Sequence, residues 1–431
     1  MQRKVLKLIC LTLILSLVLS LICVTIALAA KKVKLTAMNV TRGPADKWFE
    51  EEFEKLYPNI DLEFQNKPWP DIYTHIQVAM EAGRADPDCI ITDAPLVFPY
   101  TFRGWLLPLD DLVDPERIKD TNEGELKAAR YQGKLMAMPI TLATSMWYYN
   151  KDMFDEAGLA YPPEAPESPT WEYIVEAAKK LVKKDASGQV ITWGMIIDQE
   201  DRPYEMLPLI GSLGGKYVSD DGLSVKGIIT SQPWKEAFKW YADLYLKWKV
   251  SPNTQHPWAA DMFVQGKVAQ MSMGPWALAY LWDQKPKFRW GITGFPHFAK
   301  GKVVYNNGGW RWGVNPRTDV LDAAIKFVNF MTTPEVEWKW FRDYHGDFPA
   351  SNTIGDRILH HPDYDEWPLR AARLEILCAQ QDTVARARTP AYLEYETIFI
   401  REANNIRHGK DIDTALQDME RDIELEMQKY R

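Results

Sequence analysis

The chain is predicted to fold as an α/β protein of two domains. Three observations support this: its length and composition, an alternating order of strand-like and helix-like segments, and a central region typical of a chain that crosses between domains. With 431 residues, the chain is too long for one ordinary domain. Its composition, 46% hydrophobic and 26% charged, is typical of a folded globular protein.

The first 29 residues differ in character from the rest of the chain. Three basic residues precede an almost unbroken apolar run over residues 8–28, and residues 27–29 (Ala-Leu-Ala) offer a small-x-small cleavage site. This pattern predicts an export signal, so the bulk of the protein is expected in the periplasm or at the cell surface. The run is long enough to span a bilayer, and an uncleaved anchor is the alternative. Lipid attachment at Cys23 is disfavoured because Ile22 stands where a small residue is expected.

Charge and cysteine content narrow the classes of partner. The formal net charge is -8, and because the first 29 residues carry three positive and no negative side chains, the remainder carries -11. An acidic surface repels phosphate, so no nucleic acid partner is expected. Of the cysteines after the signal, Cys89 lies in an apolar run, which predicts a buried thiol rather than a bridge to Cys378. The cysteine spacing indicates no metal site.

Strands and helices are predicted to alternate from residue 34 onward. The predicted order is strand 34–39, helix 46–57, strand 60–64, helix 72–82 and buried strand 87–92. The first helix has an apolar stripe formed by Trp48, Phe49, Phe53 and Leu56. This order predicts an α/β layer with a mostly parallel sheet.

The region 131–181 predicts a passage of the chain from one domain to the other. Residues 136–140 are an apolar run that fits a strand leaving a sheet, and residues 146–149 begin the next strand. Asn150 opens a short helix, and Thr170 caps a longer one over residues 171–183. A chain that crosses in this way is typical of a protein that holds a ligand between two domains.

The second domain is predicted to repeat the α/β pattern. Strands are expected at 191–197 and 268–273, and helices at 208–214, 234–248, 260–266 and 276–282. Residues 308–314 would return across the cleft to helices at 323–331 and 334–341 in the first domain. The tail, 392–428, has helical periodicity almost throughout.

Segments spread over nearly the whole chain after the signal match one protein family in order and spacing. They include MNVTRGPADKWFEEEFEKLYPNI at 38–60, YQGKLMAMPI at 131–140, FVQGKVAQMSMGPWAL at 263–278 and HGKDIDTALQDME at 408–420. Together these segments resemble the bacterial extracellular solute-binding proteins of ABC importers, in the group that includes maltose-binding and other oligosaccharide-binding proteins.

The resemblance implies an α/β, two-lobed periplasmic-binding-protein-like fold of type II. Each lobe would be a mixed sheet flanked by helices, with the ligand in the cleft between them. The N-terminal lobe would comprise residues 30–143 and 310–345, and the C-terminal lobe residues 144–309 and 346–431. Such lobes close on the ligand by a hinge motion. The implied function is to bind a carbohydrate, expected to be an oligosaccharide, and to deliver it unchanged to the permease subunits in the membrane. A monomer without a cofactor is expected.

The resemblance also implies ligand contacts on the second lobe. Trp276 matches a tryptophan that stacks on a sugar ring, because a flat aromatic plane buries the C–H face of a sugar and leaves its hydroxyls free. The alternative is a core tryptophan at a helix start. Tyr204 matches an aromatic ligand contact, whereas Arg202 departs from an acidic one and puts the identity of the sugar in doubt. Arg202 would either donate to ligand oxygens or be a solvated loop charge.

Polar candidates follow two strands of the first lobe. Asn39, Thr41 and Arg42 lie between the first strand and the first helix, where the family places ligand contacts and where a parallel sheet opens. Thr92 stands where a maltose-binding relative has a stacking tryptophan. The next residue, Asp93, is a candidate acceptor for a sugar hydroxyl, or alternatively a cap for the following loop.

Further aromatic candidates lie at the second crossing and elsewhere. Alternation places Trp310 and Trp312 on one face of a strand, so at least Trp310 is a candidate, with burial in the hinge as the alternative. Trp69, Trp147 and Tyr395 are weaker candidates. Because the chain has 18 tryptophans, most of them must be structural.

A secreted glycoside hydrolase is the competing class, because aromatic-lined clefts serve both functions. Hydrolysis needs two facing carboxylates, yet no Asp or Glu lies in a motif that marks it as catalytic. The sequence has no Gly-x-Ser-x-Gly elbow, phosphate loop or His-Glu-x-x-His helix. The pair His360–His361 reads as part of a polar loop rather than a metal site. Polyamine, peptide and metal receptors share the architecture, but polyamine binding would need several acids, so a carbohydrate is the preferred ligand.

Overall fold

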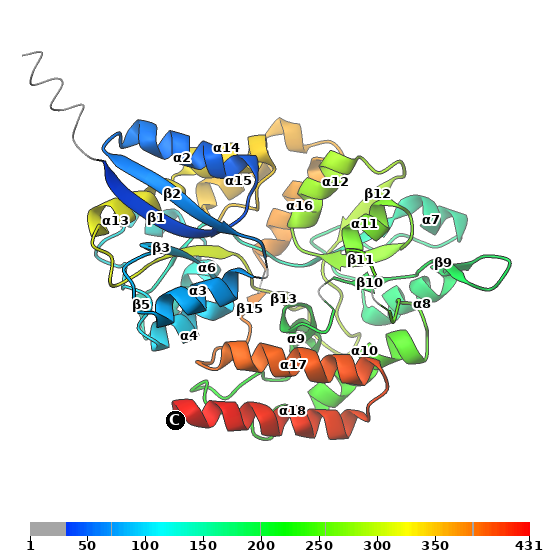
Figure 1. Ribbon diagram of the computed structural model, residues 1–431. Helices are drawn as coiled ribbons and strands as arrows, with labels where there is room; N and C mark the ends of the chain where they lie inside the picture. The colour runs from blue at the N-terminus through cyan, green and yellow to red at the C-terminus, as the bar shows by residue number, and fades with distance from the viewer. Residues whose placement is uncertain (1–31, 70, 199, 255, 382) are drawn as a thin grey trace, which may run out of the picture. The chain divides into compact units, whose positions relative to one another are not determined.

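The computed structural model describes residues 32–69, 71–198, 200–254, 256–381 and 383–431 (Figure 1). The predicted export signal lies outside the described residues. The chain divides into two compact units: the first ends at Asp88 and includes Arg317–Phe327, and the second comprises Cys89–Pro316 and Val328–Arg431. These boundaries differ from those expected for the two lobes, and the lobe assignment stays a prediction.

The first unit is built on two parallel strands. β1 (Val33–Val40) and β2 (Ile60–Lys67) pair in parallel along their whole length. The helix α2 (Pro44–Leu56) connects them, and α3 (Ile72–Glu81) follows β2. The predicted order of strand, helix, strand and helix is confirmed.

Aromatic side chains form the core of the first unit. Phe53 of α2 and Phe64 of β2 both lie edge-on to Phe327, with ring centroids 5.9 and 5.8 Å apart. Phe327 belongs to α13 (Leu321–Met331). The predicted apolar stripe of α2 is buried except for Leu56, which is 59% exposed. That part of the prediction is wrong, since Leu56 is the last residue of the helix and falls beyond its buried face.

The second unit contains mixed sheets, as the resemblance implied. β14 (Trp310–Val314) pairs antiparallel with both β3 (Cys89–Asp93) and β6 (Met138–Pro139). β14 therefore departs from the mostly parallel sheet expected. The second sheet has the order β10 (Ile196–Ile197), β11 (Gln270–Met273), β7 (Met146–Asn150) and β12 (Trp290–Thr293).

Three short strand pairs complete the second unit. They are β4 (Arg130–Tyr131) with β5 (Lys134–Leu135), β8 (Lys183–Lys184) with β9 (Val190–Thr192), and β13 (Tyr305–Asn306) with β15 (Thr383–Val384).

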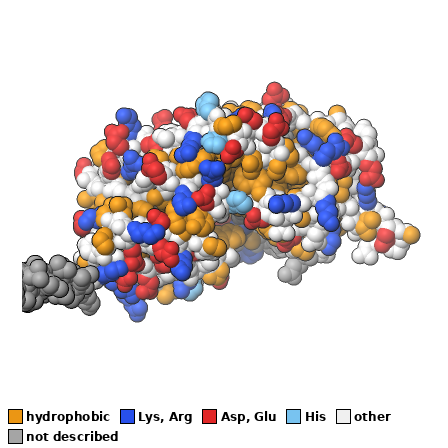
Figure 2. Space-filling view, turned by 90° about the horizontal axis from the view of Figure 1, so that it is seen from above, with side chains coloured by type: hydrophobic (Ala, Val, Ile, Leu, Met, Phe, Trp, Pro, Cys, Tyr) orange, Lys and Arg blue, Asp and Glu red, His pale blue; other side chains and the backbone are white. Residues whose placement is uncertain are grey.

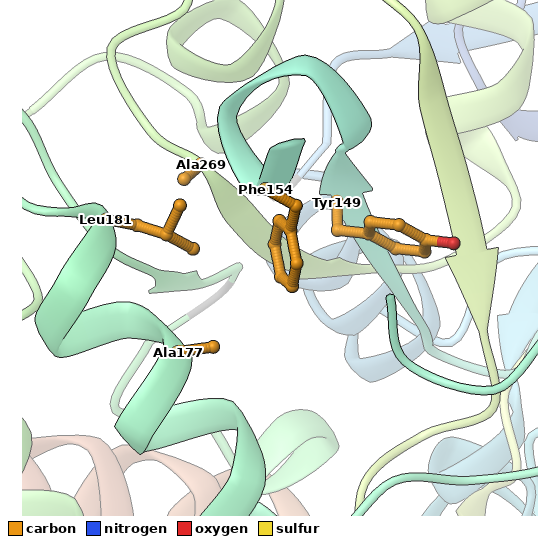
Figure 3. Close-up of a cluster of buried hydrophobic side chains, with 5 residues drawn as sticks. All are labelled: Tyr149, Phe154, Ala177, Leu181 and Ala269. Carbon is orange, nitrogen blue, oxygen red and sulfur yellow. The ribbon is translucent and has the colours of Figure 1, made fainter. Parts of the chain in front are cut away.

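A hydrophobic cluster joins α8 (Trp171–Leu181) to the second sheet (Figure 3). Ala177 and Leu181, one turn apart on α8, lie on the same side of the helix as Phe154 of α7 (Lys151–Glu156). Tyr149 of β7 packs against Phe154 at 5.3 Å between ring centroids, and Ala269 completes the cluster. Ala177 and Leu181 therefore belong to an apolar stripe that buries one face of α8.

Two helices of the second unit begin where the sequence predicts. The side chain of Thr170 accepts a hydrogen bond from the amide of Tyr173 at 3.2 Å. The side chain of Asn150 accepts one from the amide of Met153 at 3.0 Å. Each bond satisfies an amide that the first helical turn leaves without a partner, which is why these residue types favour the position.

Other predictions for the second unit are wrong in their boundaries. The strand expected at 191–197 is two strands, because the amides of Gly194 and Met195 both donate to the carbonyl of Val250 instead of continuing a ladder. The helix expected at 208–214 is α9 (Pro203–Ser212). It starts earlier because Pro203 fits the first helical turn, where its missing N–H costs nothing.

Several elements were not predicted, among them β12, α15 (Asn352–His360) and α16 (Arg370–Ala379). The pair His360–His361 therefore lies at the end of α15 and is not part of a long polar loop. The remaining elements are the 3-10 turns η1 (Ala94–Leu96), η2 (Pro362–Tyr364) and η3 (Gln428–Tyr430), with α4 (Val97–Phe102), α5 (Pro115–Asp120), α6 (Glu123–Ala128), α10 (Gln232–Leu246), α11 (Ala259–Val264), α12 (Trp276–Gln284) and α14 (Pro334–Tyr344).

The C-terminal tail is helical, as predicted, and it forms two adjacent helices. α17 (Tyr392–Arg407) and α18 (Ile412–Met427) lie side by side at the C-terminus (Figure 1). On the face seen in Figure 2, acidic and basic side chains are interspersed. Within the described residues, no helix has the length and apolar character needed to cross a membrane. Cys89 in β3 and Cys378 in α16 are buried thiols, as predicted for Cys89.

Candidate functional site

Three extended segments of the second unit run side by side next to the candidate site. Ala143 forms an antiparallel bridge with Gly308, and Thr141 forms one with Pro349. The amide of Trp310 donates to the hydroxyl of Thr141 at 2.7 Å. Residues 141–145, 306–310 and 348–350 are thus held together mainly by backbone contacts.

The side chain of Asn306 ties these segments to the start of α9. Its Oδ1 accepts from the amide of Ser145 at 2.6 Å, and its Nδ2 donates to the Ser145 hydroxyl at 2.7 Å. The same Nδ2 donates to the backbone carbonyl of Tyr204 at 3.1 Å. The Ser145 hydroxyl in turn donates to Glu205 Oε1 at 2.7 Å. These buried hydrogen bonds fix the backbone that carries Tyr204.

Glu205 is fully buried within this network. Burial raises the pKa of Glu205 to about 8, although the hydrogen bond from Ser145 opposes the shift. The carboxyl group therefore keeps its proton at neutral pH, because an uncharged acid is cheaper to bury than a carboxylate.

Tyr204 and Trp276 form an aromatic pair, with ring centroids 5.9 Å apart and ring planes inclined by 41°. Tyr204 lies in the first turn of α9 and is buried, whereas Trp276 is the first residue of α12 and is partly exposed. Two glycines make room for the rings. A Cβ on Gly274 would lie 2.2 Å from the Trp276 ring, and one on Gly308 would lie 2.8 Å from the Tyr204 ring. Only glycine allows backbone and ring to approach this closely.

A buried ion pair lies against Tyr204. The guanidinium carbon of Arg386 is 5.1 Å from the centroid of the Tyr204 ring, a distance at which a cation and an aromatic face attract each other. Nη2 of Arg386 donates to Oδ1 of Asp93, and both residues are 8% exposed. The same Asp93 oxygen accepts from the amide of Ala94 at 2.7 Å. Asp93 therefore caps the following turn, the alternative that the sequence had left open, and also anchors Arg386.

A second buried ion pair extends this group of charges. Nη2 of Arg311 donates to Glu125, and Nδ2 of Asn307 donates to the other oxygen of Glu125 at 2.6 Å. Burial raises the pKa of Glu125 to about 7, while Arg311 and Asn307 oppose that shift. The charges of Asp93 and Arg386 also act on Glu125, so the two ion pairs form one buried cluster.

A small pocket adjoins this cluster. Its walls include Phe98, Asn307, Arg386 and Arg388, and it has room for about one water molecule. The Arg388 guanidinium donates to the carbonyl of Arg130 at 2.7 Å. In the described part of the chain, no group of three or more His, Cys, Asp or Glu side chains is arranged to hold a metal ion.

β14 carries the two tryptophans of the second crossing. Trp310 is opposite Asp93 in the strand register, and Trp312 is opposite Ile91. Directly opposed residues share a face of the sheet, so both tryptophans project from the face that carries Asp93, as alternation predicts. Trp310, at the strand end, is partly exposed, whereas Trp312 is completely buried. Only Trp310 therefore retains surface that a ligand could contact.

Two candidates take part in the packing of α17. Arg202 Nη2 donates to Glu396 Oε1 at 2.9 Å, so Arg202 is not the solvated loop charge considered as an alternative. Tyr395 is completely buried and stacks between Tyr392 and Phe399, with ring centroids 6.3 and 6.2 Å apart. Neither ring face of Tyr395 is open to solvent. A third candidate, Trp147 of β7, is completely buried as well.

The first unit holds the remaining candidates. Asn39 is 1% exposed, and its Nδ2 donates to Asp46 Oδ1 at 2.9 Å and to Asn66 Oδ1 at 3.1 Å. The amide of Arg42 donates to Asp46 Oδ2 at 2.8 Å. Burial raises the pKa of Asp46, which organises the turn between β1 and α2. The other two candidates of this unit, Thr41 and Trp69, are exposed.

Arg386 is the residue of this site that the sequence did not reveal. It lies in the segment TVARARTP, where Arg386 and Arg388 alternate with small residues ahead of Pro390. Two arginines in a loop just before a helix form a recognisable signal, because binding residues often lie on loops. The carboxylate that Arg386 meets is 293 residues away, and that pairing has no local signal.

A sequence profile described as bacterial extracellular solute-binding protein matches residues 40–338 of the chain. Solved structures match the fold over almost its full length. A substrate-binding protein from Listeria monocytogenes in complex with cycloalternan has a TM-score of 0.79 at 24% identity, covering 91% of this chain and 98% of that one. Maltose-bound MalE3 from T. maritima has a TM-score of 0.75 at 22% identity, covering 91% and 99%. These matches confirm the predicted α/β fold.

Curated relatives match over shorter stretches. A putative binding protein from Brucella abortus is 25% identical over 197 residues, which is 45% of this chain and 46% of that protein. An arabinooligosaccharide-binding protein from Halalkalibacterium halodurans is 26% identical over 165 residues, which is 38% of this chain and 34% of that protein. The matched region thus spans less than half the length of either relative.

Proposed function

Because this chain belongs to the family of bacterial extracellular solute-binding proteins, we propose that it captures an oligosaccharide outside the cytoplasm and delivers it to an ABC importer. The protein acts as a receptor without chemical conversion of its ligand. Its membrane partner is the permease, and it works as a monomer without nucleic acid. Closure of two lobes about a hinge signals that the ligand is bound.

The aromatic pair of Tyr204 and Trp276 carries the proposal. Trp276 keeps part of its ring exposed at the start of α12, and Tyr204 supports it from α9. An indole plane buries the C–H face of a sugar, while the hydroxyls at the edge of the sugar remain free to form hydrogen bonds. Asp93 and Trp310, opposite each other on β3 and β14, supply a polar group and a second partly exposed ring on one sheet face.

The class of ligand follows from the relatives. The Listeria protein was solved with cycloalternan, the T. maritima protein with maltose, and the H. halodurans relative is named for arabino-oligosaccharides. These ligands are all built from sugar rings, which an indole face can stack on. The ion pair between Arg386 and Asp93 supports a neutral ligand. The Asp93 carboxylate already neutralises the Arg386 guanidinium, so little positive charge remains to attract an acidic ligand.

A thermal-shift screen tests the proposed function. The screen would contain mono- and oligosaccharides, with polyamines and peptides as controls. A ligand that binds only the folded protein raises the free energy of unfolding by about 2.7 kcal/mol at a concentration about 100 times its Kd. We expect a rise in Tm with oligosaccharides alone. Stabilisation by polyamines or peptides alone, or release of product from a sugar, would contradict the proposal.

Trp276→Ala tests the residue that carries the proposal. The substitution removes the stacking surface, so the binding free energy should weaken by about 1 to 3 kcal/mol. Calorimetry with the sugar found in the screen measures this effect. Trp69→Ala is the comparison variant, because Trp69 is an exposed indole of the first unit and a weaker candidate. Comparing the affinities of the two variants separates the contribution of Trp276 from that of Trp69. Unchanged affinity in Trp276→Ala would remove Trp276 from the site.

A further inference from the structure

The exposed side of α12 continues beyond Trp276. Ala277, Leu278 and Leu281 are buried, whereas Trp276, Ala279 and Tyr280 keep exposed surface. Residues four apart on a helix lie on the same face, with a rise of about 6 Å between them. Trp276 and Tyr280 therefore follow each other along one side of α12.

A second aromatic pair lies at Tyr280. Its ring meets that of Trp258 edge-on, with centroids 4.9 Å apart. Trp258 immediately precedes α11, which packs against α12 (Figure 1). Trp258 is 40% exposed, an unusual exposure for an indole that already has an aromatic neighbour. The hydroxyl of Tyr280 donates to Asp261 of α11, which places a carboxylate beside the two rings.

We infer that Trp258 and Tyr280 form an outer sugar subsite, and that the ligand is an oligosaccharide long enough to reach it from Trp276. The inference rests on the proposed function and adds a minimum length to the ligand. The inner pair, Tyr204 with Trp276, takes one part of the sugar chain. The outer pair takes a unit further along.

The arrangement of the four rings favours a linear chain of sugars over a single ring. The two aromatic pairs are separated by one helical turn, a distance of the same order as one sugar unit. The outer pair has a carboxylate close to it, that of Asp261, which accepts from the hydroxyl of Tyr280. An aromatic face with an acceptor beside it suits a ring that has C–H groups on its face and hydroxyls at its edge.

Variants at the outer pair, measured against sugars of increasing length, test the inference. The probes are malto-, manno- and arabino-oligosaccharides of one to five units, and the series that raises the Tm of the wild-type protein is used for calorimetry. The variants are Trp258→Ala, Tyr280→Ala and Trp276→Ala. Tyr161→Ala is the matched control, because Tyr161 is 39% exposed and its hydroxyl also donates to an aspartate, Asp155.

Length dependence is the decisive readout. Trp258→Ala and Tyr280→Ala should weaken binding of the longer members about fivefold to tenfold and leave the shortest binding member unchanged. Trp276→Ala should weaken every member, and Tyr161→Ala none. Affinities of Trp258→Ala and Tyr280→Ala equal to wild type at every length would overturn the outer subsite and leave the proposed function intact.

Two further outcomes are also decisive. An equal loss at every length in Trp258→Ala would overturn the inference, since it would indicate a general disturbance of α11 and α12. If no sugar series binds the wild-type protein, the proposed function fails and the outer subsite fails with it. The Tm of each variant without sugar shows whether it is folded, and the partial exposure of Trp258 and Tyr280 predicts that both variants are.

Discussion

At the scale of single residues, Arg386 connects a buried ion pair to an aromatic residue of the candidate site. Its guanidinium contacts the Tyr204 ring and donates to Asp93 in a nearly buried environment. Removing one partner of such a pair leaves an uncompensated buried charge, which costs more than the pair itself contributes. The residue therefore couples the stability of the protein to the position of Tyr204, a candidate ligand contact.

Arg386→Gln should lower the free energy of unfolding by about 3 to 5 kcal/mol, because the substitution removes the cationic partner of the buried Asp93 carboxylate. Urea denaturation measures the change. The double variant Asp93→Asn/Arg386→Gln is the control and should be less destabilised than the sum of the two single variants, since it removes both charges. Additive effects would show that the two residues do not depend on each other.

At the scale of elements, the start of α12 determines how Trp276 is presented. The ring lies so close to Gly274 that any side chain there would displace it. The helix buries one side in the protein and leaves Trp276 at its first turn partly exposed. The exposure of this candidate residue therefore depends on how α12 begins.

Gly274→Ala should weaken sugar binding about tenfold, close to the effect of Trp276→Ala, because the added Cβ would lie 2.2 Å from the indole and force it aside. Gly355→Ala is the matched control. Gly355 lies within α15 and a Cβ there would meet nothing within 4 Å, so this variant should bind as wild type and gain slightly in stability. Wild-type affinity in Gly274→Ala would mean that the ring position is not needed.

At the scale of the whole molecule, several buried carboxyl groups link stability to pH. Burial raises the pKa of Glu205 and Glu375 to about 8 and that of Glu125 to about 7, from an ordinary value of 4.5. At a pH between the ordinary pKa and the raised pKa, these carboxyl groups therefore keep their protons in the folded protein and lose them in the unfolded chain. The contribution of these groups to stability is fully present below the unfolded pKa and is lost as pH rises through that window.

The free energy of unfolding should decrease from about pH 5 to pH 8, by up to about 1.4 kcal/mol per pH unit for each group. Glu205→Gln removes one titrating group and should give a shallower dependence. Urea denaturation at several pH values measures both slopes. Glu116→Gln, which alters an exposed carboxylate, should keep the wild-type slope. Equal slopes for wild type and Glu205→Gln would contradict the buried, protonated state of Glu205.

Much of the candidate site could be predicted from the sequence because the motif around Trp276 has a characteristic order of residues. The structure brings Trp276 together with Tyr204, another predicted residue, and places Trp310 opposite Asp93. Trp312 was predicted by alternation to share a face with Trp310. Its complete burial could not be predicted, since alternation tells the face of a strand but not how far that face is covered.

The sequence alone determined the α/β class, the order of strands and helices from β1 to β3, and the starts of α7 and α8. Periodicity and capping act within a few residues, so the local sequence is enough to specify them. Only the tertiary structure decided that Arg386 meets Tyr204 and Asp93, that Glu125 meets Arg311, and that α12 carries a row of exposed rings toward Trp258. These contacts join segments far apart in the chain, and they exist only once the sheets and helices have packed.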